Sequence, residues 1–255
     1  MSSSLLQASA ASFLLSDGDH QVSWTFLDTG FGTAAFNMER DEQLAHALQR
    51  KEIDHTLRVY GWKPAAISIG MNQNIEEFDL ERVIAEHLDI VRRPTGGRAI
   101  LHSQELTYSV VMRAAEIGPR EIYRIISNAL IRGLRKLGIE AELSGEDAFP
   151  DKRMRAPESI PCFSGSAKYE IQYHGKKLVG SAQRRYGDVV LQHGSLLLGD
   201  DHLRILDFIK PDSGNIDLVS RTIDAGTILG RAVSFEETAQ ALRRGFEESL
   251  SITFS

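Results

Sequence analysis

The sequence is almost without cysteine, because Cys162 is the only one among 255 residues. A single cysteine cannot form a disulfide within the chain, and a structural zinc site made of several thiolates is also excluded. Cys162 is therefore either a buried bystander, which is the commoner role of a lone cysteine, or a reactive thiol. Its sequence context has to decide between these two roles.

Long apolar runs and an excess of positive charge are also lacking. No apolar run approaches the roughly 18 residues that a membrane-spanning helix needs. The first residues have a short apolar middle but no basic start, which predicts a loosely ordered segment over 1–18 and not a signal peptide. The net charge of −6 argues against nonspecific nucleic-acid binding, which requires a broad basic surface. These absences predict a cytoplasmic protein with no membrane and no nucleic-acid partner.

Internal repeats, low-complexity segments and linkers are absent as well, which predicts one domain over 1–255. Hydrophobic residues make up 42% of the chain and charged residues 25%, as is usual for a globular protein with a proper core. The alternation of strands and helices predicts an α/β protein with a mixed sheet flanked by helices. The expected elements are a strand at 21–30, a helix at 33–51, a buried strand at 65–70, a helix at 75–88, a helix from Pro119 to Gly138, a hairpin over 168–185, a strand at 188–198 broken at His193 and Gly194, and a helix capped by Ser234 and Glu237.

A glycine loop followed by a strand is the most unusual stretch, RRPTGGRAILHSQELTYSVV at 92–111. In its second half, apolar residues alternate with polar ones, which is typical of a half-buried strand. The apolar positions are Leu106, Tyr108 and Val110, and the polar ones are Glu105, Thr107 and Ser109. The loop therefore leads directly into a strand.

The loop itself combines two glycines with three arginines. Gly96 and Gly97 have no Cβ, so a ligand can approach the main-chain amides closely. Arg92, Arg93 and Arg98 surround that approach with positive charge. Such a loop suits a phosphate, a carboxylate or a pantetheine arm that bears a thioester, although a tight turn with solvated arginines explains it equally well.

Four ordered motifs resemble one family. The stretch RRPTGGRAILHSQELTYSVV resembles the TGGR(A)xxH signature of the lipoate–protein ligase A and octanoyltransferase superfamily, and KKLVGSAQRRYGDVVLQHGSLLL resembles its KxxGSAQ and HGSLLL signature. FNMERDEQL at 36–44 and YGWKPAAISIGMNQ at 60–73 are similar to two further family segments. The resemblance spans roughly residues 22–200. The chain is identified as a member of this superfamily.

The resemblance implies a fold shared with biotin protein ligases and related to class II aminoacyl-tRNA synthetases. It implies an apolar tunnel for an octanoyl or lipoyl chain, with the carbonyl beside Lys177. The implied acceptor is a lysine of a lipoyl domain or of glycine cleavage H protein. His193 is expected first of all to fix the chain before Gly194. The residues expected to bind substrate are Arg93, Thr95, Gly96, Gly97, Arg98, His102, Gly180, Ser181, Ala182, His193 and Gly194.

Two activities compete within the superfamily. A ligase activates lipoate with ATP and magnesium, whereas a cysteine-dependent octanoyltransferase takes octanoyl from acyl carrier protein onto a thiolate and needs no cofactor. The PCF around Cys162 resembles the transferases, and the segment after about residue 200 is too short for the accessory domain of many ligases. The prediction is therefore an octanoyltransferase in protein lipoylation with Cys162 and Lys177 as catalytic residues and no metal.

Several alternatives remain open at this stage. The chain could be a lipoate–protein ligase, including the catalytic half of a bipartite one, or an amidotransferase between lipoyl domains. A sensor that has kept the pocket but lost the chemistry is a third possibility. Either Lys177 or His102 could lower the pKa of the thiol. Trp62 is expected in the core, and Arg184 and Arg185 are either solvated or attract an acidic protein partner.

Overall fold

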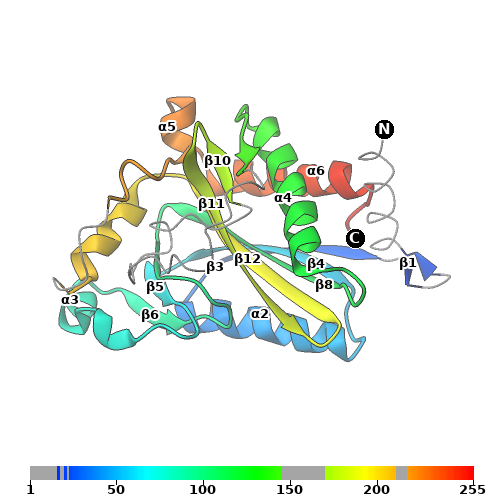
Figure 1. Cartoon of the computed structure of the whole chain (residues 1–255), viewed down its shortest axis with the longest axis horizontal. Helices are drawn as coiled ribbons and strands as arrows, with labels where there is room; N and C mark the ends of the chain where they lie inside the picture. Colours follow the sequence, from blue (N-terminus) through cyan, green and yellow to red (C-terminus); the bar gives the residue numbers. More distant parts are fainter. Residues whose placement is uncertain (1–15, 18–19, 22, 145–169, 211–216) are drawn as a thin grey trace, which may run out of the picture.

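The centre of the molecule is a mixed sheet of seven strands (Figure 1). The structure is a computed structural model that describes residues 16–17, 20–21, 23–144, 170–210 and 217–255. In spatial order the strands are β3 (Trp24–Gly32), β4 (His55–Trp62), β8 (Glu105–Arg113), β12 (Val189–Leu197), β11 (Lys176–Tyr186), β10 (Ile171–Tyr173) and β9 (Glu142–Leu143). Only the pair β3 and β4 is parallel in this sheet. The predicted α/β class with a mixed sheet is confirmed.

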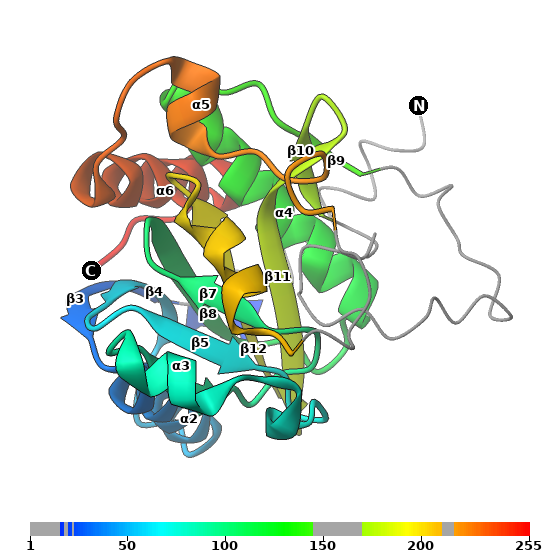
Figure 2. The same ribbon diagram turned by 90° about the vertical axis from the view of Figure 1, so that its left-hand side faces the viewer.

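A smaller sheet lies beside β12 and β8 and forms a second layer (Figure 2). Its strands are, in order, β6 (Asp89–Arg92), β5 (Ala66–Ile69) and β7 (Ile100–His102). The helical segments near it are η1 (Ile75–Glu77), α3 (Leu80–Ala85) and η3 (Asp201–Phe208). The helix expected at 75–88 is thus split, because Phe78 is extended and Asp79 caps a new helix by accepting from the backbone of Arg82.

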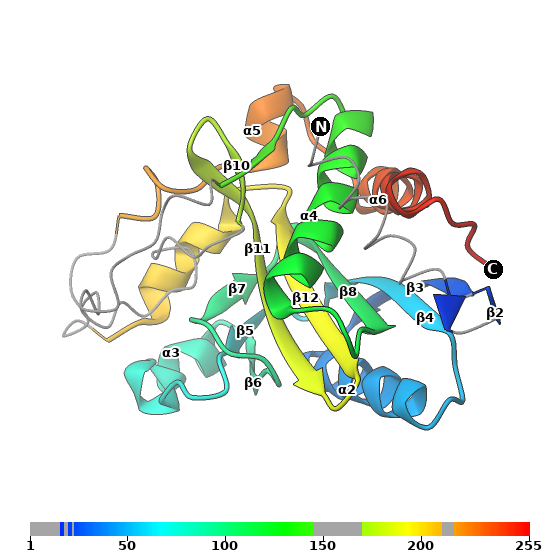
Figure 3. The same ribbon diagram turned by 45° about the vertical axis from the view of Figure 1, so that its right-hand side comes forward.

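Helices cover both faces of the large sheet (Figure 3). The helices α4 (Pro119–Lys136) and α6 (Phe235–Leu250) pack together on one face, and a Cβ at Gly245 would lie 2.3 Å from the backbone nitrogen of Gly133, so both helices need glycine there. The helix α2 (Ala34–Gln49) lies on the other face, beside the small sheet. The remaining short elements are α5 (Ala225–Leu229) and the strand pair β1 (Ser16–Asp17) and β2 (His20–Gln21). In the described ranges, no helix has the length and apolarity to cross a membrane.

Helix ends follow the local signals of the sequence. Thr33 caps α2 by accepting from the backbone of Phe36, and Ser234 caps α6 by accepting from the backbone of Glu237. Gly138 follows α4 with a φ of +89°, as the C′ position of a helix favours. These predictions are confirmed, while the single domain over 1–255 stays a prediction. Most of the segment 1–18 lies outside the described residues.

Two strand predictions need correction, and both concern the centre of the sheet. The strand β8 was expected to be half-buried, but both of its faces are covered, one by α4 and α6 and the other by α2 and the small sheet. Its polar face, with Glu105, Thr107 and Ser109, is therefore buried as well. The strand β12 was expected to break at His193 and Gly194, but it is continuous from Val189 to Leu197. A central strand tolerates this glycine because both neighbouring strands hold its backbone.

Candidate functional site

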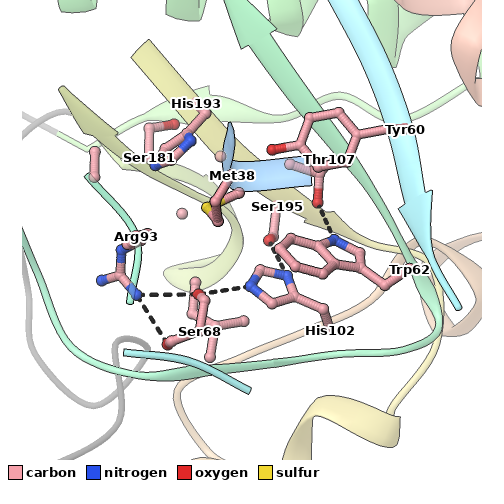
Figure 4. Close-up of a pocket in the computed structure, with 14 residues that line it drawn as sticks. Met38, Tyr60, Trp62, Ser68, Arg93, His102, Thr107, Ser181, His193 and Ser195 are labelled. Atoms are coloured by element: carbon pink, nitrogen blue, oxygen red, sulfur yellow. Dashed lines mark hydrogen bonds between the residues drawn. The ribbon is translucent and has the colours of Figure 1, made fainter. Parts of the chain in front are cut away.

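A narrow cavity lies between the two sheets (Figure 4). Three cross-strand pairs of β11 and β12 line it, namely Gly180 with Ser195, Ser181 with Gly194, and Ala182 with His193. The small sheet, β4, β8 and α2 complete the wall. The lining residues are Met38, Tyr60, Trp62, Ser68, Arg93, Ile100, His102, Thr107, Gly180, Ser181, Ala182, His193, Gly194 and Ser195. Seven of the eleven residues expected to bind substrate are thus brought to one cavity.

Gly194 leaves no room for a side chain at the floor of this cavity. A Cβ at that position would lie 2.4 Å from the carbonyl oxygen of Gly180 and 2.8 Å from the ring of Tyr108. We expect Gly194→Ala to lower the free energy of unfolding by about 1–3 kcal/mol, because two central strands would have to move apart. Gly96→Ala is the matched control, since a Cβ there meets nothing within 4 Å. Urea unfolding of both variants would measure this, and equal midpoints would contradict it.

Two buried histidines of the cavity are held in the same way. The Nδ1 of His102 lies 3.0 Å from Glu105 Oε1, and its Nε2 lies 2.7 Å from Ser68 Oγ. The Nδ1 of His193 lies 3.0 Å from Asp41 Oδ2, and its Nε2 lies 2.7 Å from Thr95 Oγ1. An ionised carboxylate only accepts, so each Nδ1 donates and each Nε2 accepts from a hydroxyl. Both imidazoles are therefore fixed in orientation and tautomer.

Neighbouring donors hold the pKa of both carboxylates below the ordinary value. Burial by itself raises the pKa of Asp41, but His193 and the Arg58 guanidinium hold this pKa below its ordinary value. Burial also raises the pKa of Glu105, whereas His102 and neighbouring hydroxyls bring it below the ordinary value. Both side chains consequently remain acceptors at neutral pH.

Two of the three arginines beside the glycine loop donate hydrogen bonds to backbone carbonyl oxygens. Arg93 is buried and donates to the carbonyl oxygens of Ser68, Gly96 and Arg98. Arg92 donates through Nη1 to three carbonyl oxygens, those of Gly70, Met71 and Gln73. Within the described ranges, the guanidinium of Arg98 makes no hydrogen bond or ion pair. The cation in this loop that remains for a ligand is therefore Arg98, and the interpretation of three freely solvated arginines is wrong.

The glycine loop packs against the end of β5. A Cβ on Gly70 would lie 1.9 Å from the carbonyl oxygen of Gly97, so the two backbones approach as closely as glycine permits. Gly97 has a φ of +93°, which few other residues adopt. Gly96 and Gly97 are exposed, whereas Thr95 is buried on His193. The loop thus presents an exposed backbone edge supported by a buried side chain.

Lys177 lies on β11, three residues before Gly180, but it does not line the cavity. Its side chain is buried and its ammonium donates to Glu170 Oε1. Its backbone nitrogen and carbonyl oxygen bond to Arg221 and Ile223. The alternative of a solvated hairpin lysine is therefore wrong, and Lys177 forms a buried ion pair next to the strand that lines the cavity.

Other predicted residues have different outcomes. Cys162 lies outside the described residues. Arg184 donates to the carbonyl oxygen of Pro94, and Arg185 donates to those of Ala114 and Ile117, so neither side chain is simply solvated. In the described part of the chain, no group of three or more His, Cys, Asp or Glu side chains could hold a metal ion.

Sequence reasoning missed half of the cavity wall. Trp62 is buried as expected, but it lines the cavity and stacks on His102, with ring centroids 4.0 Å apart and an interplanar angle of 14°. Ser68 belongs to the same YGWKPAAISIGMNQ motif, so this motif carried the signal. The other lining residues without a prediction are Met38, Tyr60, Ile100, Thr107 and Ser195. Glu105 and Asp41, which hold the two histidines, were not predicted either.

Comparison with known proteins gives consistent results. Residues 33–247 match the family model of the lipoyl protein ligase A/B catalytic domain. The chain is 44% identical to octanoyltransferase LipM of Kyrpidia tusciae over 238 residues, which is 89% of this chain and 87% of the relative. It is 37% identical to octanoyltransferase LipM of Bacillus subtilis over 243 residues, covering 90% and 87%. A bipartite lipoate protein ligase of Thermoplasma acidophilum has the same fold, with a TM-score of 0.71 and 23% identity over 92% of this chain and 86% of that one.

Proposed function

Because this chain belongs to the lipoyl protein ligase A/B catalytic domain family and is an octanoyltransferase of protein lipoylation, we propose that octanoyl-acyl carrier protein is its donor. The acceptor in this proposal is a lysine of a lipoyl domain, with glycine cleavage H protein as the other acceptor of the same chemistry. The intermediate is an octanoyl thioester on Cys162. No ATP and no metal take part.

The cavity between the sheets is the observation that supports the proposal best. Its wall combines apolar side chains such as Met38, Trp62 and Ile100 with the bare backbone of Gly180 and Gly194. Such a wall suits a slim, unbranched acyl chain and excludes water from it. The tightly fixed histidines leave few polar groups without a partner. A nucleotide or a sugar would find little to bond here.

The order of the strands suggests the direction of the acyl chain. The residues that line the cavity come from β11, β12, β8 and β4, which together span three strand spacings or about 14 Å. An octanoyl chain has seven C–C bonds and is roughly 9 Å long when extended. Figure 4 has Ser181 and His193 on one side of the cavity and Trp62 and Tyr60 on the other. Because Lys177 belongs to β11, we assign the carbonyl to the β11 side and the methyl end to the β4 side.

The proposed reaction consists of two transfers. The Cys162 thiolate attacks the carbonyl carbon of the donor thioester, a new C–S bond forms, and the bond to the pantetheine sulfur breaks. The released thiolate takes up a proton. The amine of the acceptor lysine then attacks the carbonyl carbon of the Cys162 thioester, the C–N bond forms, the C–S bond to Cys162 breaks, and the amine proton passes to the cysteine sulfur. Exchange between thioesters is nearly isoenergetic and the amide is more stable, so the sequence needs no ATP.

The glycine loop has a role in docking the donor. Gly96 and Arg98 lie next to the cavity, because Arg93, which lines it, donates to both of their carbonyl oxygens, and Gly96 and Gly97 are exposed. A pantetheine arm carries a phosphate and amides, which such an edge binds with charge and hydrogen bonds. In this proposal the loop holds the arm while the cavity holds the acyl chain.

A transfer assay tests the proposed function. Purified protein is mixed with octanoyl-acyl carrier protein and an apo lipoyl domain without ATP, and the lipoyl domain is analysed by intact mass spectrometry. We expect one octanoyl group on the lipoyl domain. Modification only with ATP and free lipoate would identify a ligase instead. Transfer only from an octanoylated lipoyl domain or H protein would identify an amidotransferase between such domains.

Lys177 is proposed to stabilise the negative charge that develops on the thioester oxygen. We expect Lys177→Ala to lower kcat/KM of the transfer about 100-fold, as loss of one donor to such an oxyanion does. Lys176→Ala is the matched control, because this neighbouring ammonium donates to the exposed carbonyl oxygen of Val219 and not to Glu170. Glu170→Gln keeps the Lys177 ammonium but weakens its buried ion pair. Equal transfer rates of Lys177→Ala and Lys176→Ala would contradict this role. If Glu170→Gln loses as much activity as Lys177→Ala, the effect belongs to the ion pair and not to the ammonium alone.

A further inference from the structure

One carboxylate oxygen organises the β4 end of the cavity. Glu105 Oε1 accepts from Trp62 Nε1 at 3.1 Å and from His102 Nδ1 at 3.0 Å, and Thr107 also donates to it. The rings of Trp62 and His102 are stacked, so their faces form a continuous wall. All of these side chains are at least 95% buried. Glu105 Oε1 is therefore the acceptor that both rings share, and Trp62 Nε1 donates in addition to Thr107 Oγ1 at 2.8 Å.

The wall is fixed from its second side as well. Ser68 Oγ accepts from Arg93 Nη1 at 3.2 Å and so directs its own proton to His102 Nε2, 2.7 Å away. His102 is thereby held at both nitrogens and by the stack on Trp62. Rotation of either ring would break at least one buried hydrogen bond, and a buried polar group without a partner is costly.

A second, wide-open pocket lies next to this wall. Glu105 belongs to its lining, together with Gln104, Leu198, Val233 and Phe235. The second carboxylate oxygen, Oε2, is buried and accepts no hydrogen bond from the described residues. Glu105 is thus a partition between the end wall of the acyl cavity, which its Oε1 holds, and the second pocket, which the residue also lines.

We infer that Glu105 determines the longest acyl chain this enzyme accepts, by holding Trp62 and His102 across the methyl end of the cavity. This inference rests on the proposed function. A chain longer than eight carbons has to displace the stacked pair, which the buried hydrogen bonds oppose. Without the Glu105 side chain, both rings lose their common acceptor and the cavity opens toward the space beside Phe235. Glu105 is therefore a positioning residue for specificity and takes no part in the chemical steps.

Two substitutions distinguish the effect of the Glu105 side chain on the wall from the effect of its charge. Glu105→Ala removes the partition. Glu105→Gln keeps it, because the amide oxygen can replace Oε1 and the amide nitrogen can take the place of Oε2, which has no partner to lose. We expect wild type and Glu105→Gln to prefer octanoyl over dodecanoyl donors by a similar ratio of kcat/KM. In Glu105→Ala this ratio should shift toward dodecanoyl at least tenfold, since each additional buried methylene strengthens binding roughly fourfold.

A binding experiment makes the inference independent of turnover. The chain has only two tryptophans, so in a Trp24→Phe background the fluorescence reports on Trp62. Octanoate and dodecanoate are titrated against wild-type and Glu105→Ala forms of this background. We expect the affinity for dodecanoate, relative to the affinity for octanoate, to rise at least tenfold in Glu105→Ala. If octanoyl transfer is observed but neither the kcat/KM ratio nor the affinity ratio changes in Glu105→Ala, this inference fails while the proposed function stands. If transfer is absent, the proposed function fails, and the titration still tests whether Glu105 limits the chain length.

Stability controls exclude a general structural effect. A variant that only loosens the fold would lower the activity with both chain lengths by the same factor, which would overturn the inference. Thermal unfolding identifies such a variant. Should Glu105→Ala not fold, His102→Ala truncates the other half of the wall and leaves the carboxylate in place, and the same shift toward dodecanoyl is expected.

Discussion

Replacing Cys162 by serine is expected to lower the rate of octanoyl transfer at least about 1000-fold, because a serine hydroxyl is a far weaker nucleophile than a thiolate without a dedicated base. Intact mass spectrometry should show one octanoyl group on the wild-type chain after mixing with octanoyl-acyl carrier protein, and none on Cys162→Ser. Hydroxylamine at neutral pH should remove the group, since thioesters are cleaved under these conditions. Addition of an apo lipoyl domain should discharge the acyl-enzyme.

The unusual composition makes this test unambiguous. Cys162 is the only cysteine, so an adduct that hydroxylamine removes has one possible position. If Cys162→Ser transfers octanoyl at the wild-type rate, the thioester mechanism is wrong and direct attack by the acceptor amine replaces it. If neither protein carries an adduct and only ATP with lipoate modifies the lipoyl domain, the enzyme is a ligase.

Elements with local signals could be predicted from the sequence. Thr33, Ser234 and Gly138 act within a few residues of their own helices, and their roles are as expected. The continuity of β12 through Gly194 could not be predicted, because it depends on hydrogen bonds to β8 and β11, which come from distant parts of the chain. A glycine in a strand pattern suggests a break when only neighbours in sequence are considered.

The site was predictable where a motif carried it, and not where a long-range contact did. The glycine loop and the GSA segment contain the expected residues around the cavity, but the partners of the two histidines remained hidden. Asp41 and His193 are 152 positions apart, and Asp41 resembles any polar residue of a surface helix. Glu105 fell on the polar side of an alternating strand, which usually faces water. Only the packing of α2 and the small sheet turns these two positions into buried acceptors.

The same packing completely buries the charged pair of Asp41 and Arg58. Both side chains are completely buried, and Arg58 Nη1 donates to Asp41 Oδ1 at 2.7 Å. Tyr60 donates to Asp41 Oδ2 at 2.9 Å, and its ring lies 3.9 Å from the guanidinium carbon. Because His193 shares this carboxylate, the pair also supports the cavity wall. Removal of one partner leaves the other as an uncompensated buried charge.

We therefore expect Asp41→Asn and Arg58→Met each to lower the free energy of unfolding by about 3–5 kcal/mol at pH 7. The double variant should cost at least about 2 kcal/mol less than the sum of both, since it contains neither unpaired charge. The folded pKa of Asp41 lies below the ordinary 3.8, so its stabilisation is present above that pH and is lost as the pH falls through the folded pKa. Urea unfolding at several pH values should accordingly show the difference between wild type and Asp41→Asn narrowing in acid. If the double variant loses as much free energy of unfolding as the two single variants together, the two side chains stabilise the fold independently and not as an ion pair.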